Sequence, residues 1–432
     1  MTGEQRTMGL WTATALVVGS MIGSGVFLLP AALAPYGAAS LLGWGATMGG
    51  ALLLALVYSW LARQITTSGG SYAYARHGFG DGVGFLVAWS NWISMWCGNA
   101  ALAVAFAGSL GAVWPAATAT PLRGAACALV ALWLCTAVNV AGVREAGRMQ
   151  LFTTVLKLVP LLLFGVLGFF WVDVASFQPF NPSQQPLFAA TTAVAALTLW
   201  AFLGFEAATI PTNSIRDPER TVPRATLIGM LVAGAATMLA CTVVIGLLPA
   251  AVLAESSAPM ADAASRLWGP AAGGGIGVVA TSSCFGALNG WVLLQAQVPL
   301  AAARDGLFPE VFQRVDSRGT PVIGLLLSSA LATAVAVANF NQSLVKLFAF
   351  SILLSTAAAL LPYAVSVTAW LKKSPGASAS RRLTALGALA YSLWALIGTG
   401  VESLAWGAAL LLVGAPVYWW QRKNATPLTY RP

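Results

Sequence analysis

The stretch Gly19-Ser20-Met21-Ile22-Gly23-Ser24-Gly25 places three glycines within seven residues, in the middle of a long apolar segment. A second apolar segment contains Trp200-Ala201-Phe202-Leu203-Gly204-Phe205-Glu206, followed by Pro211. Backbone groups that leave helical hydrogen bonding inside a bilayer are tolerated only where they line protein or a polar cavity. The two stretches therefore predict two interrupted membrane helices. For the first stretch, the alternative is that its glycines only allow neighbouring helices to pack closely.

The composition around these stretches is typical of a membrane protein. Of 432 residues, 58% are hydrophobic and 8% are charged, whereas soluble chains carry about a quarter of their residues as charges. This balance excludes a cytosolic enzyme or a disordered chain and predicts a lipid bilayer as the surroundings. The net charge of +9 would suit nucleic acid only if it formed a basic face. No basic cluster exceeds a few residues, so we expect no nucleic-acid partner.

Twelve apolar runs have the length of a membrane-spanning helix, which is about 20 residues. They do not alternate as the strands of a membrane barrel would, so the predicted fold is an all-α integral membrane protein with twelve transmembrane helices. The first run continues past Pro30 without a clear cleavage site, which argues against a cleaved signal peptide. The runs lie near residues 9–34, 40–63, 82–112, 123–143, 148–172, 189–213, 223–250, 272–300, 320–340, 345–371, 383–400 and 403–421.

The basic residues are distributed unevenly between the connections. Of the 22 lysines and arginines, 18 fall in the N-terminus, the even-numbered connections and the C-terminal tail. The odd-numbered connections contain only Arg123, Arg266 and Lys346. Because cytoplasmic loops hold the excess of basic residues in membrane proteins, both termini are predicted to be cytoplasmic.

The two interrupted segments are the first and the sixth, and each opens a block of five helices. An odd number of spans per block inverts the second block relative to the first. We therefore expect one domain over residues 1–432, with inverted repeats at 9–172 and 189–371 and two further helices within 383–421. Paired interrupted helices in inverted halves indicate the substrate site of a transporter.

Two charged residues lie deep within apolar segments. A charge there costs at least about 2.5 kcal/mol on insertion scales and is functional by default. Glu206 is predicted to couple a proton to transport, and the alternative is a protonated strut between helices. Lys157 lies about 10 residues into its segment, near the bilayer centre. We expect it to face carbonyl groups freed at Gly19–Gly25, and the alternative is that it reaches a water-filled vestibule.

The sequence carries no enzyme signature. The only histidine, His77, falls in a polar loop, and no HExxH, phosphate loop or intramembrane aspartate pair is present. We therefore expect no catalytic residue, no cofactor and no metal site. The cysteines lie in apolar runs without CxxC spacing and are predicted to be core residues. They are Cys97, Cys127, Cys135, Cys241 and Cys284.

Several motifs together resemble the amino acid/polyamine/organocation (APC) superfamily, which shares a five-plus-five inverted repeat. The resemblance extends from about residue 9 to the tail. The spacing of Trp200, Glu206 and Trp291 is similar to that of the bacterial arginine/agmatine antiporters of acid resistance. The other motifs are Gly23-Ser24-Gly25-Val26-Phe27-Leu28-Leu29-Pro30, Gly69-Gly70-Ser71-Tyr72-Ala73-Tyr74-Ala75-Arg76 and Asp305-Gly306-Leu307-Phe308-Pro309.

The resemblance implies a substrate-binding role for individual residues. The substrate carboxylate would meet Ser24 and the Gly25 amide at a helix N-terminus, where an anion is favoured. Backbone carbonyls would accept from the α-amine, and an amide and an indole would receive the distal group. The remaining positions implied in substrate binding are Met21, Ser94, Met95, Asn99, Leu102, Trp200, Leu203, Trp291 and Ser355.

The resemblance also implies two gates. Trp200 would close over the substrate, and Tyr72, Glu206 and Tyr363 would form a gate toward the cytoplasm. In other members of the superfamily a lysine at the position of Lys157 replaces a sodium ion, so a sodium-driven mechanism is not expected.

Several positions depart from the arginine/agmatine pattern, so the cargo stays open. We predict exchange of extracellular arginine for intracellular agmatine by alternating access, in a homodimer of the bacterial inner membrane. The alternative is a proton-coupled transporter or exporter of lysine, ornithine, putrescine or neutral amino acids. A channel would need a continuous polar pore, against which the tryptophan gate argues. The departures are Ser20 for Asn, Asn91 for Tyr, Met95 for Cys, and Ala201 and Ala287 for Ser.

Overall fold

The apolar runs fold into helices, as the absence of a period-two pattern predicts. The computed structural model describes residues 8–66, 69–141, 143–210, 212, 215–338 and 343–424, and the side chains of Ser24 and residues 143–155 lie outside this description. Within the described residues the one β-type pairing is a single bridge between Met8 and Ile215. The helices are α1 (Leu10–Met21), α2 (Ser24–Leu33), α3 (Ser40–Gln64), α4 (Ser71–Phe79), α5 (Asp81–Val113), α6 (Pro121–Ala141), α7 (Val143–Gly168), α8 (Leu187–Leu199), α9 (Pro218–Leu247), α10 (Ala250–Glu255), α11 (Pro259–Trp268), α12 (Pro270–Arg304), α13 (Val322–Ala338), α14 (Leu344–Lys373), α15 (Ala379–Gly398) and α16 (Gly400–Asn424).

Short 3-10 helices join or extend several of these elements. Two of them, η5 and η6, follow α8 and belong to the second interrupted segment. They are η1 (Ala34–Ala39), η2 (Pro115–Ala117), η3 (Phe169–Trp171), η4 (Val174–Phe177), η5 (Trp200–Phe202), η6 (Ala207–Thr209) and η8 (Glu310–Gln313).

Each of the twelve predicted segments falls on a helix or, for the interrupted ones, on consecutive helical pieces. Seven helical stretches of the described chain are long and apolar enough to cross a membrane, the first being α1 to α3 taken together. Three shorter apolar helices lie at Leu156–Trp171, Leu187–Phe202 and Val322–Ala338. The all-helical membrane class is therefore confirmed, whereas the count of twelve spans and the inverted repeat stay predictions.

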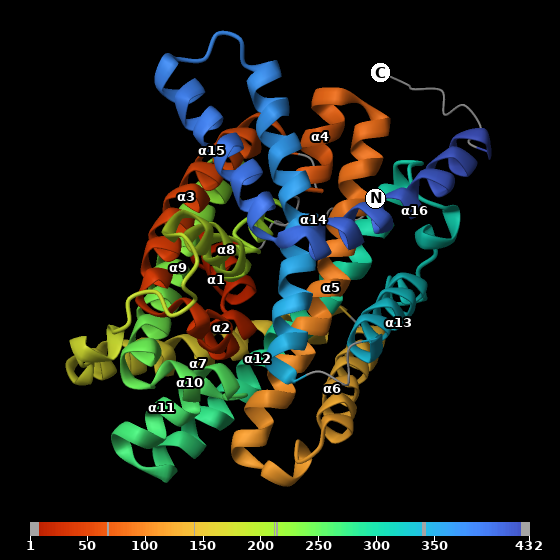
Figure 1. Cartoon of the computed structure of the whole chain (residues 1–432). Coiled ribbons are helices and arrows are strands. Elements are labelled where there is room, and N and C mark those ends of the chain that lie inside the picture. The colour runs from red at the N-terminus through yellow and green to blue at the C-terminus, as the bar shows by residue number, and fades with distance from the viewer. Residues whose placement is uncertain are drawn as a thin grey trace.

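Three helices lie in connections that the hydropathy pattern did not mark as helical. Helix α4 joins α3 to α5, and α10 and α11 join α9 to α12. Figure 1 shows α10 and α11 at one end of the bundle and α4 at the other. They are short or less apolar, so a search for spans passes over them.

Helix α5 runs through the middle of the molecule and packs most extensively against α12 and α14 (Figure 1). Helices α1 and α3 pack against α9 on another side. The interior between these groups holds large side chains with almost no exposure, among them Trp44, Phe202, Phe205 and Lys157. The interrupted segments α1–α2 and α8–η5 lie in this interior, which places the broken backbone inside protein as the bilayer requires.

The outer helices present apolar side chains outward. On α16, Val401 is 83% and Leu412 is 71% exposed, a pattern that suits contact with lipid chains and not with water. The first turn of α15 carries Arg381, whose guanidinium lies 5.7 Å from the centre of the Trp60 ring. An arginine beside a tryptophan at a helix end is typical of the membrane interface.

Candidate substrate site

The first interruption separates α1 from α2 at two residues. Ile22 is extended (ψ 96°), and Gly23 adopts φ −136° and ψ −130°. The break frees carbonyl groups of the last turn of α1, and side chains of other helices bond to them. Lys157 Nζ on α7 donates to the Gly19 carbonyl at 2.6 Å, and Trp291 Nε1 on α12 donates to the Ser20 carbonyl at 3.2 Å. The contact predicted for Lys157 is therefore confirmed.

The glycines of this break lie so close to other helical segments that an added Cβ would press against its neighbours. A Cβ on Gly23 would lie 3.0 Å from Ala287 Cβ and 3.1 Å from Leu102 Cδ2, and one on Gly25 would lie 3.2 Å from Trp200 Cδ1. Close helix packing, the alternative reading of these glycines, is thus also present. Both readings hold at the same place, because the backbone breaks where other helical segments approach closely.

The second interruption follows α8. After η5, Leu203 is extended (φ −60°, ψ 135°), and Gly204 has φ +98°, a conformation that side chains rarely adopt. A Cβ on Gly204 would lie 3.0 Å from Ser20 Cβ. The two interruptions, 184 positions apart in the sequence, therefore touch each other in the fold.

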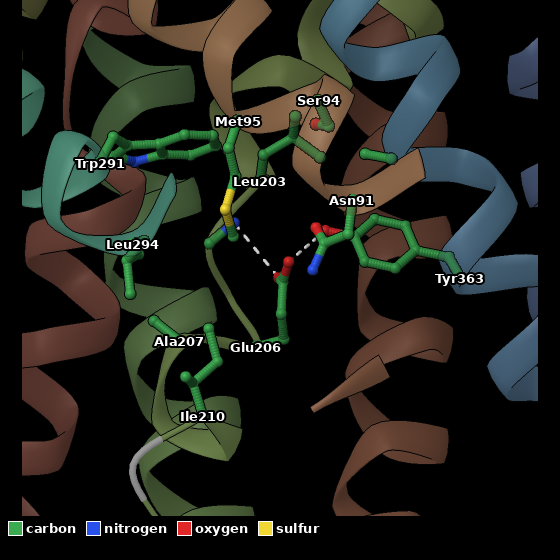
Figure 2. A pocket seen from close by; sticks show the side chains of 12 residues that line it. Asn91, Ser94, Met95, Leu203, Glu206, Ala207, Ile210, Trp291, Leu294 and Tyr363 are labelled. Carbon is green, nitrogen blue, oxygen red and sulfur yellow. Dashed lines mark hydrogen bonds between the residues drawn. The ribbon is translucent and has the colours of Figure 1, made fainter. Parts of the chain in front are cut away.

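Glu206 lies between Gly204 and η6 and is partly buried. Its Oε1 accepts from the Tyr363 hydroxyl at 2.9 Å, and its Oε2 accepts from the Gly204 amide at 3.2 Å (Figure 2). Its backbone carbonyl accepts from the Thr209 hydroxyl at 2.7 Å. These bonds hold the carboxyl group in place and leave each oxygen with capacity for a further donor.

A cavity opens beside this carboxyl group. In Figure 2 the Trp291 indole borders one part of it and the Tyr363 ring another, with the Glu206 carboxylate between them. Glu206 is the one charged residue among the described residues that line it. A small cavity with a single buried negative charge and aromatic walls suits an organic cation. The lining residues are Asn91, Ser94, Met95, Leu203, Gly204, Glu206, Ala207, Ile210, Trp291, Leu294, Ala359 and Tyr363.

Two tryptophans lie together where the interruptions meet α5. The Trp200 and Trp291 ring centres are 5.6 Å apart, with their planes tilted by 43°. A Cβ on Gly98 would lie 2.9 Å from Trp200 Cη2 and 3.1 Å from Trp291 Cζ3. Gly98 therefore provides the space for both indoles. Trp291 lines the cavity, whereas Trp200 does not.

Of the remaining predicted binding residues, Ser94, Met95 and Leu203 line the cavity, whereas Met21, Asn99, Leu102 and Ser355 do not. The Ser355 hydroxyl donates to the Ser94 carbonyl at 2.7 Å, which joins α14 to α5. Met21 is 4% exposed, and Leu102 lies against Gly23. Asn99 has no exposure and does not line the cavity; its Nδ2 donates to Gln295 Oε1 at 2.7 Å. The predicted role of the Ser24 side chain falls outside the described part of the chain.

The gate of Tyr72, Glu206 and Tyr363 stays a prediction, and in this structure its three residues do not all bond to one another. Tyr363 bonds to Glu206, but the Tyr72 hydroxyl donates to Asp305 at the end of α12. Arg76 Nη1 lies 3.1 Å from Asp305 Oδ2, and Arg76 Nε lies 2.7 Å from Asp81 Oδ1. Helix α4 begins at Ser71, so its first turn faces the end of α12 and not Glu206. Burial and the Asp305 carboxylate raise the pKa of Tyr72, which keeps the hydroxyl protonated as a donor.

Two aromatic residues pack against Tyr363 beside Glu206. The Phe205 ring lies 5.2 Å and the Tyr58 ring 5.6 Å from the Tyr363 ring. Tyr58 is further fixed by its bond to the Ser71 hydroxyl at 2.6 Å. These two residues, and the cavity residue Asn91, were not among the predicted site residues. An amide in an otherwise apolar helix was the available signal for Asn91.

Within the described residues, no group of three or more potential metal ligands occurs, and the five cysteines are free. The cysteines lie 3.3 to 4.0 Å from backbone carbonyls where such contacts are formed, as for Cys127 and Cys241. Their prediction as core residues holds for four of them, and Cys127 is half-buried.

Comparison with known proteins gives a family and several relatives. The family model described as amino acid permease matches residues 8–425. The putrescine transporter PotE of Haemophilus influenzae is 30% identical over 426 residues, which cover 97% of this chain and 98% of the relative. PotE of Escherichia coli K12 is 30% identical over 96% of each chain. The cadaverine/lysine antiporter of E. coli K12 is 35% identical over 333 residues, 76% of this chain and 74% of the relative.

Proposed function

The chain belongs to the amino acid permease family, and we propose that it exchanges a basic amino acid for a diamine across a bacterial inner membrane. It is a multi-pass membrane transporter and not an enzyme. The proposal includes twelve spans in a single domain with two inverted repeats of five, and alternating access around the two interruptions. Cytoplasmic termini and a homodimer complete it.

The observation that carries the proposal is the Glu206 carboxylate in the cavity. Among the described residues it is the one charge on the lining, its side chain accepts from Tyr363 and Gly204, and no described cation forms a salt bridge with it. A buried carboxylate without a cationic partner is costly, so a cationic cargo completes the pair. Diamines and basic amino acids supply such a charge, and neutral amino acids supply it only through the α-amine.

The first interruption supplies the groups that would bind the carboxylate of an amino acid cargo. The amino end of α2, at Ser24 and Gly25, carries backbone amides without helical partners, and a carboxylate bound there would be stabilised by the helix dipole. An amino acid would use both ends, and a diamine would use the Glu206 end. This difference supports exchange, because both cargoes compete for one site.

The relatives shift the predicted cargo. Sequence motifs favour arginine and agmatine, whereas the matched relatives are named for putrescine and for cadaverine and lysine. We therefore place lysine with cadaverine, and ornithine with putrescine, ahead of arginine with agmatine. The five departures from the arginine/agmatine pattern support the same order.

Counterflow in proteoliposomes tests the proposal. Vesicles loaded with unlabelled cadaverine, putrescine, agmatine or no amine are placed in labelled lysine, ornithine or arginine, and initial uptake is measured. We expect uptake of lysine or ornithine to rise at least fivefold with the matching diamine inside. Trp291→Ala should abolish it, whereas Trp406→Ala, at an indole 55% exposed on α16, should not.

The other outcomes separate the alternatives. Uptake driven equally well into empty vesicles by a pH gradient would replace exchange with proton coupling. Stimulation by agmatine of arginine uptake alone would restore the arginine/agmatine assignment. Competition by leucine as strong as by lysine would exclude a cation-selective site.

A further inference from the structure

A chain of buried polar side chains runs from α6 to α5, beside the cavity. It links Thr136 on α6, Ser329 on α13, Gln295 on α12 and Asn99 on α5. All four are at most 1% exposed. The two hydroxyl oxygens are 2.7 Å apart, Gln295 Nε2 lies 3.0 Å from Ser329 Oγ, and Asn99 Nδ2 lies 2.7 Å from Gln295 Oε1. Buried polar chains of this kind specify orientation, because each lost partner is costly.

The hydrogen bonds between these four side chains have a defined donor-to-acceptor order, which is determined at the Thr136 end. The Thr136 hydroxyl donates its only proton to the Leu132 carbonyl at 2.8 Å, so it can only accept from Ser329. Ser329 then donates to Thr136 and accepts from Gln295 Nε2. This turns the Gln295 oxygen toward Asn99, which donates to it through Nδ2. The Asn99 oxygen is left over, and it has no hydrogen-bond partner among the described residues.

The neighbours of Asn99 on α5, and of Gln295 on α12, indicate the surroundings of this oxygen. Met95, one turn before it on the same face of α5, lines the cavity. Leu102, one turn after it, lies against Gly23 at the first interruption. Gln295 lies one turn beyond Trp291 on α12, which also lines the cavity. Asn99 itself does not line the cavity, so the unpaired acceptor lies within the protein, one helical turn from the cavity residue Met95 and one turn from Leu102.

We propose that Gln295 is a positioning residue that holds the Asn99 amide with its carbonyl oxygen toward the substrate, so that the site selects cargo with an N–H donor at that end. The inference rests on the proposed function and names the residues that would recognise the second amine of the cargo. A buried acceptor left without a partner is costly, and an amine entering from the cavity removes that cost. A methyl or methylene group at the same place leaves it unpaired.

The test compares cargo pairs that differ by a single amine. Lysine and norleucine, and cadaverine and pentylamine, compete against labelled lysine in the counterflow assay, and the ratio of half-inhibitory concentrations is measured within each pair. Gln295→Met keeps the volume and removes both hydrogen bonds, so the Asn99 amide loses its fixed orientation. We expect the preference for the amine to fall about tenfold, which corresponds to about 1.4 kcal/mol. A structural role alone would lower uptake with both ratios unchanged.

A remote variant keeps the test sharp if Gln295→Met does not fold. Thr136→Val has the same shape but removes the acceptor for Ser329, which can then donate to Gln295 and allow both amides to reverse. We expect a smaller loss of amine preference, about threefold. Thr333→Val is the matched control, because Thr333 donates to the Ser329 backbone carbonyl at 2.8 Å and lies outside the chain. Its ratios should equal those of the unaltered protein.

Each remaining outcome has one meaning. Unchanged ratios in both Gln295→Met and Thr136→Val, with normal uptake, would overturn the positioning role and leave the exchanger intact. No competition by any of the four compounds in the unaltered protein would reject the proposed function, and the inference with it.

Discussion

The first interruption, at Ile22 and Gly23, and the second, from Leu203 to Glu206, differ in how their freed backbone groups are held. Carbonyls of the first accept from side chains on other helices, Lys157 and Trp291. At the second, the Gly204 amide donates to Glu206, which lies two residues further along the same segment. The first break therefore depends on its neighbours, and the second is largely held by its own residues.

The charges at the two breaks are opposite as well. A cation lies behind the first break, away from the cavity, and an anion lies at the second, on the cavity wall. The Lys157 ammonium is bonded to a backbone carbonyl of the protein. The Glu206 carboxylate lies on the cavity wall, where we propose that it binds the cargo. Substitutions at the two breaks should therefore separate stability from transport.

The largest expected effect on transport is that of Glu206→Gln. The amide has the shape of the carboxyl group, and its oxygen can accept from the Gly204 amide while its NH2 group donates to the Tyr363 hydroxyl oxygen, so folding should be spared. The charge for the cationic cargo is lost, and removing one partner of a buried charge pair costs about 2–5 kcal/mol. We expect at least a 30-fold fall in kcat/KM for diamine exchange, measured by counterflow, with the unfolding temperature in detergent unchanged.

Glu402→Gln is the control, because Glu402 is exposed on α16. The same experiment tests coupling: the pH dependence of exchange should flatten in Glu206→Gln. A variant with the same pH profile and rate as the unaltered protein would remove Glu206 from both roles.

At the first break, Lys157→Met should reduce stability and transport together. It removes a charged donor from the Gly19 carbonyl, a bond that contributes about 1.5–3 kcal/mol. Thermal unfolding in detergent should shift to lower temperature, and exchange should fall about tenfold. Lys157→Gln, which keeps an N–H donor, should lose less of both. Full stability in Lys157→Met would contradict the dependence of this break on its neighbours.

Two alanine substitutions compare the backbone of the breaks directly. Gly204→Ala forces a side chain into φ +98° and against Ser20, for which we expect a loss of about 1–3 kcal/mol. Gly25→Ala needs no unusual φ and meets Trp200 at 3.2 Å and Ala201 at 3.4 Å, so its loss should stay below about 1 kcal/mol. Unfolding of the two variants under one set of conditions checks the order, which the reverse ranking would contradict.

The smallest effect is expected at Asp305, which follows α12 and bonds to Tyr72 and Arg76 of α4. Asp305→Asn removes the charge from a partly exposed ion pair with Arg76 and keeps one oxygen that can accept from Tyr72. Exposed pairs contribute about 0–1 kcal/mol, so stability should hardly change. Exchange rates should change about twofold, measured as above with Asp173→Asn, in the loop after α7, as the control. A fall in the exchange rate as large as that of Glu206→Gln would show that the contacts of Asp305 control the site.

The helices and the two breaks could be predicted from the sequence because both are local. Apolar length determines where a span lies, and the glycines of Gly19–Gly25 mark where helical bonding stops. The contact of Lys157 also followed, since a buried ammonium needs acceptors and a broken helix is where carbonyls become free. The charge of Glu206 in an apolar segment similarly indicated the cavity.

The contacts that were missed depend on how distant segments meet. The Tyr72 hydroxyl bonds to Asp305, 233 positions away, and no local pattern in the sequence indicates that pairing. Asn99 was predicted to meet the cargo, but the sequence does not show which helix face would supply Gln295. Amides have many equivalent partners, so their pairing follows from the packing and cannot be read from spacing.

The tryptophan pair has a spectroscopic consequence. Two indoles held 5.6 Å apart at a fixed tilt of 43° are close enough for their excited states to couple, and their arrangement is chiral. The pair therefore gives the protein a signal in near-ultraviolet circular dichroism that depends on the distance between Trp200 and Trp291. Opening of the site on either side would change that signal, and access could be followed optically without an added label.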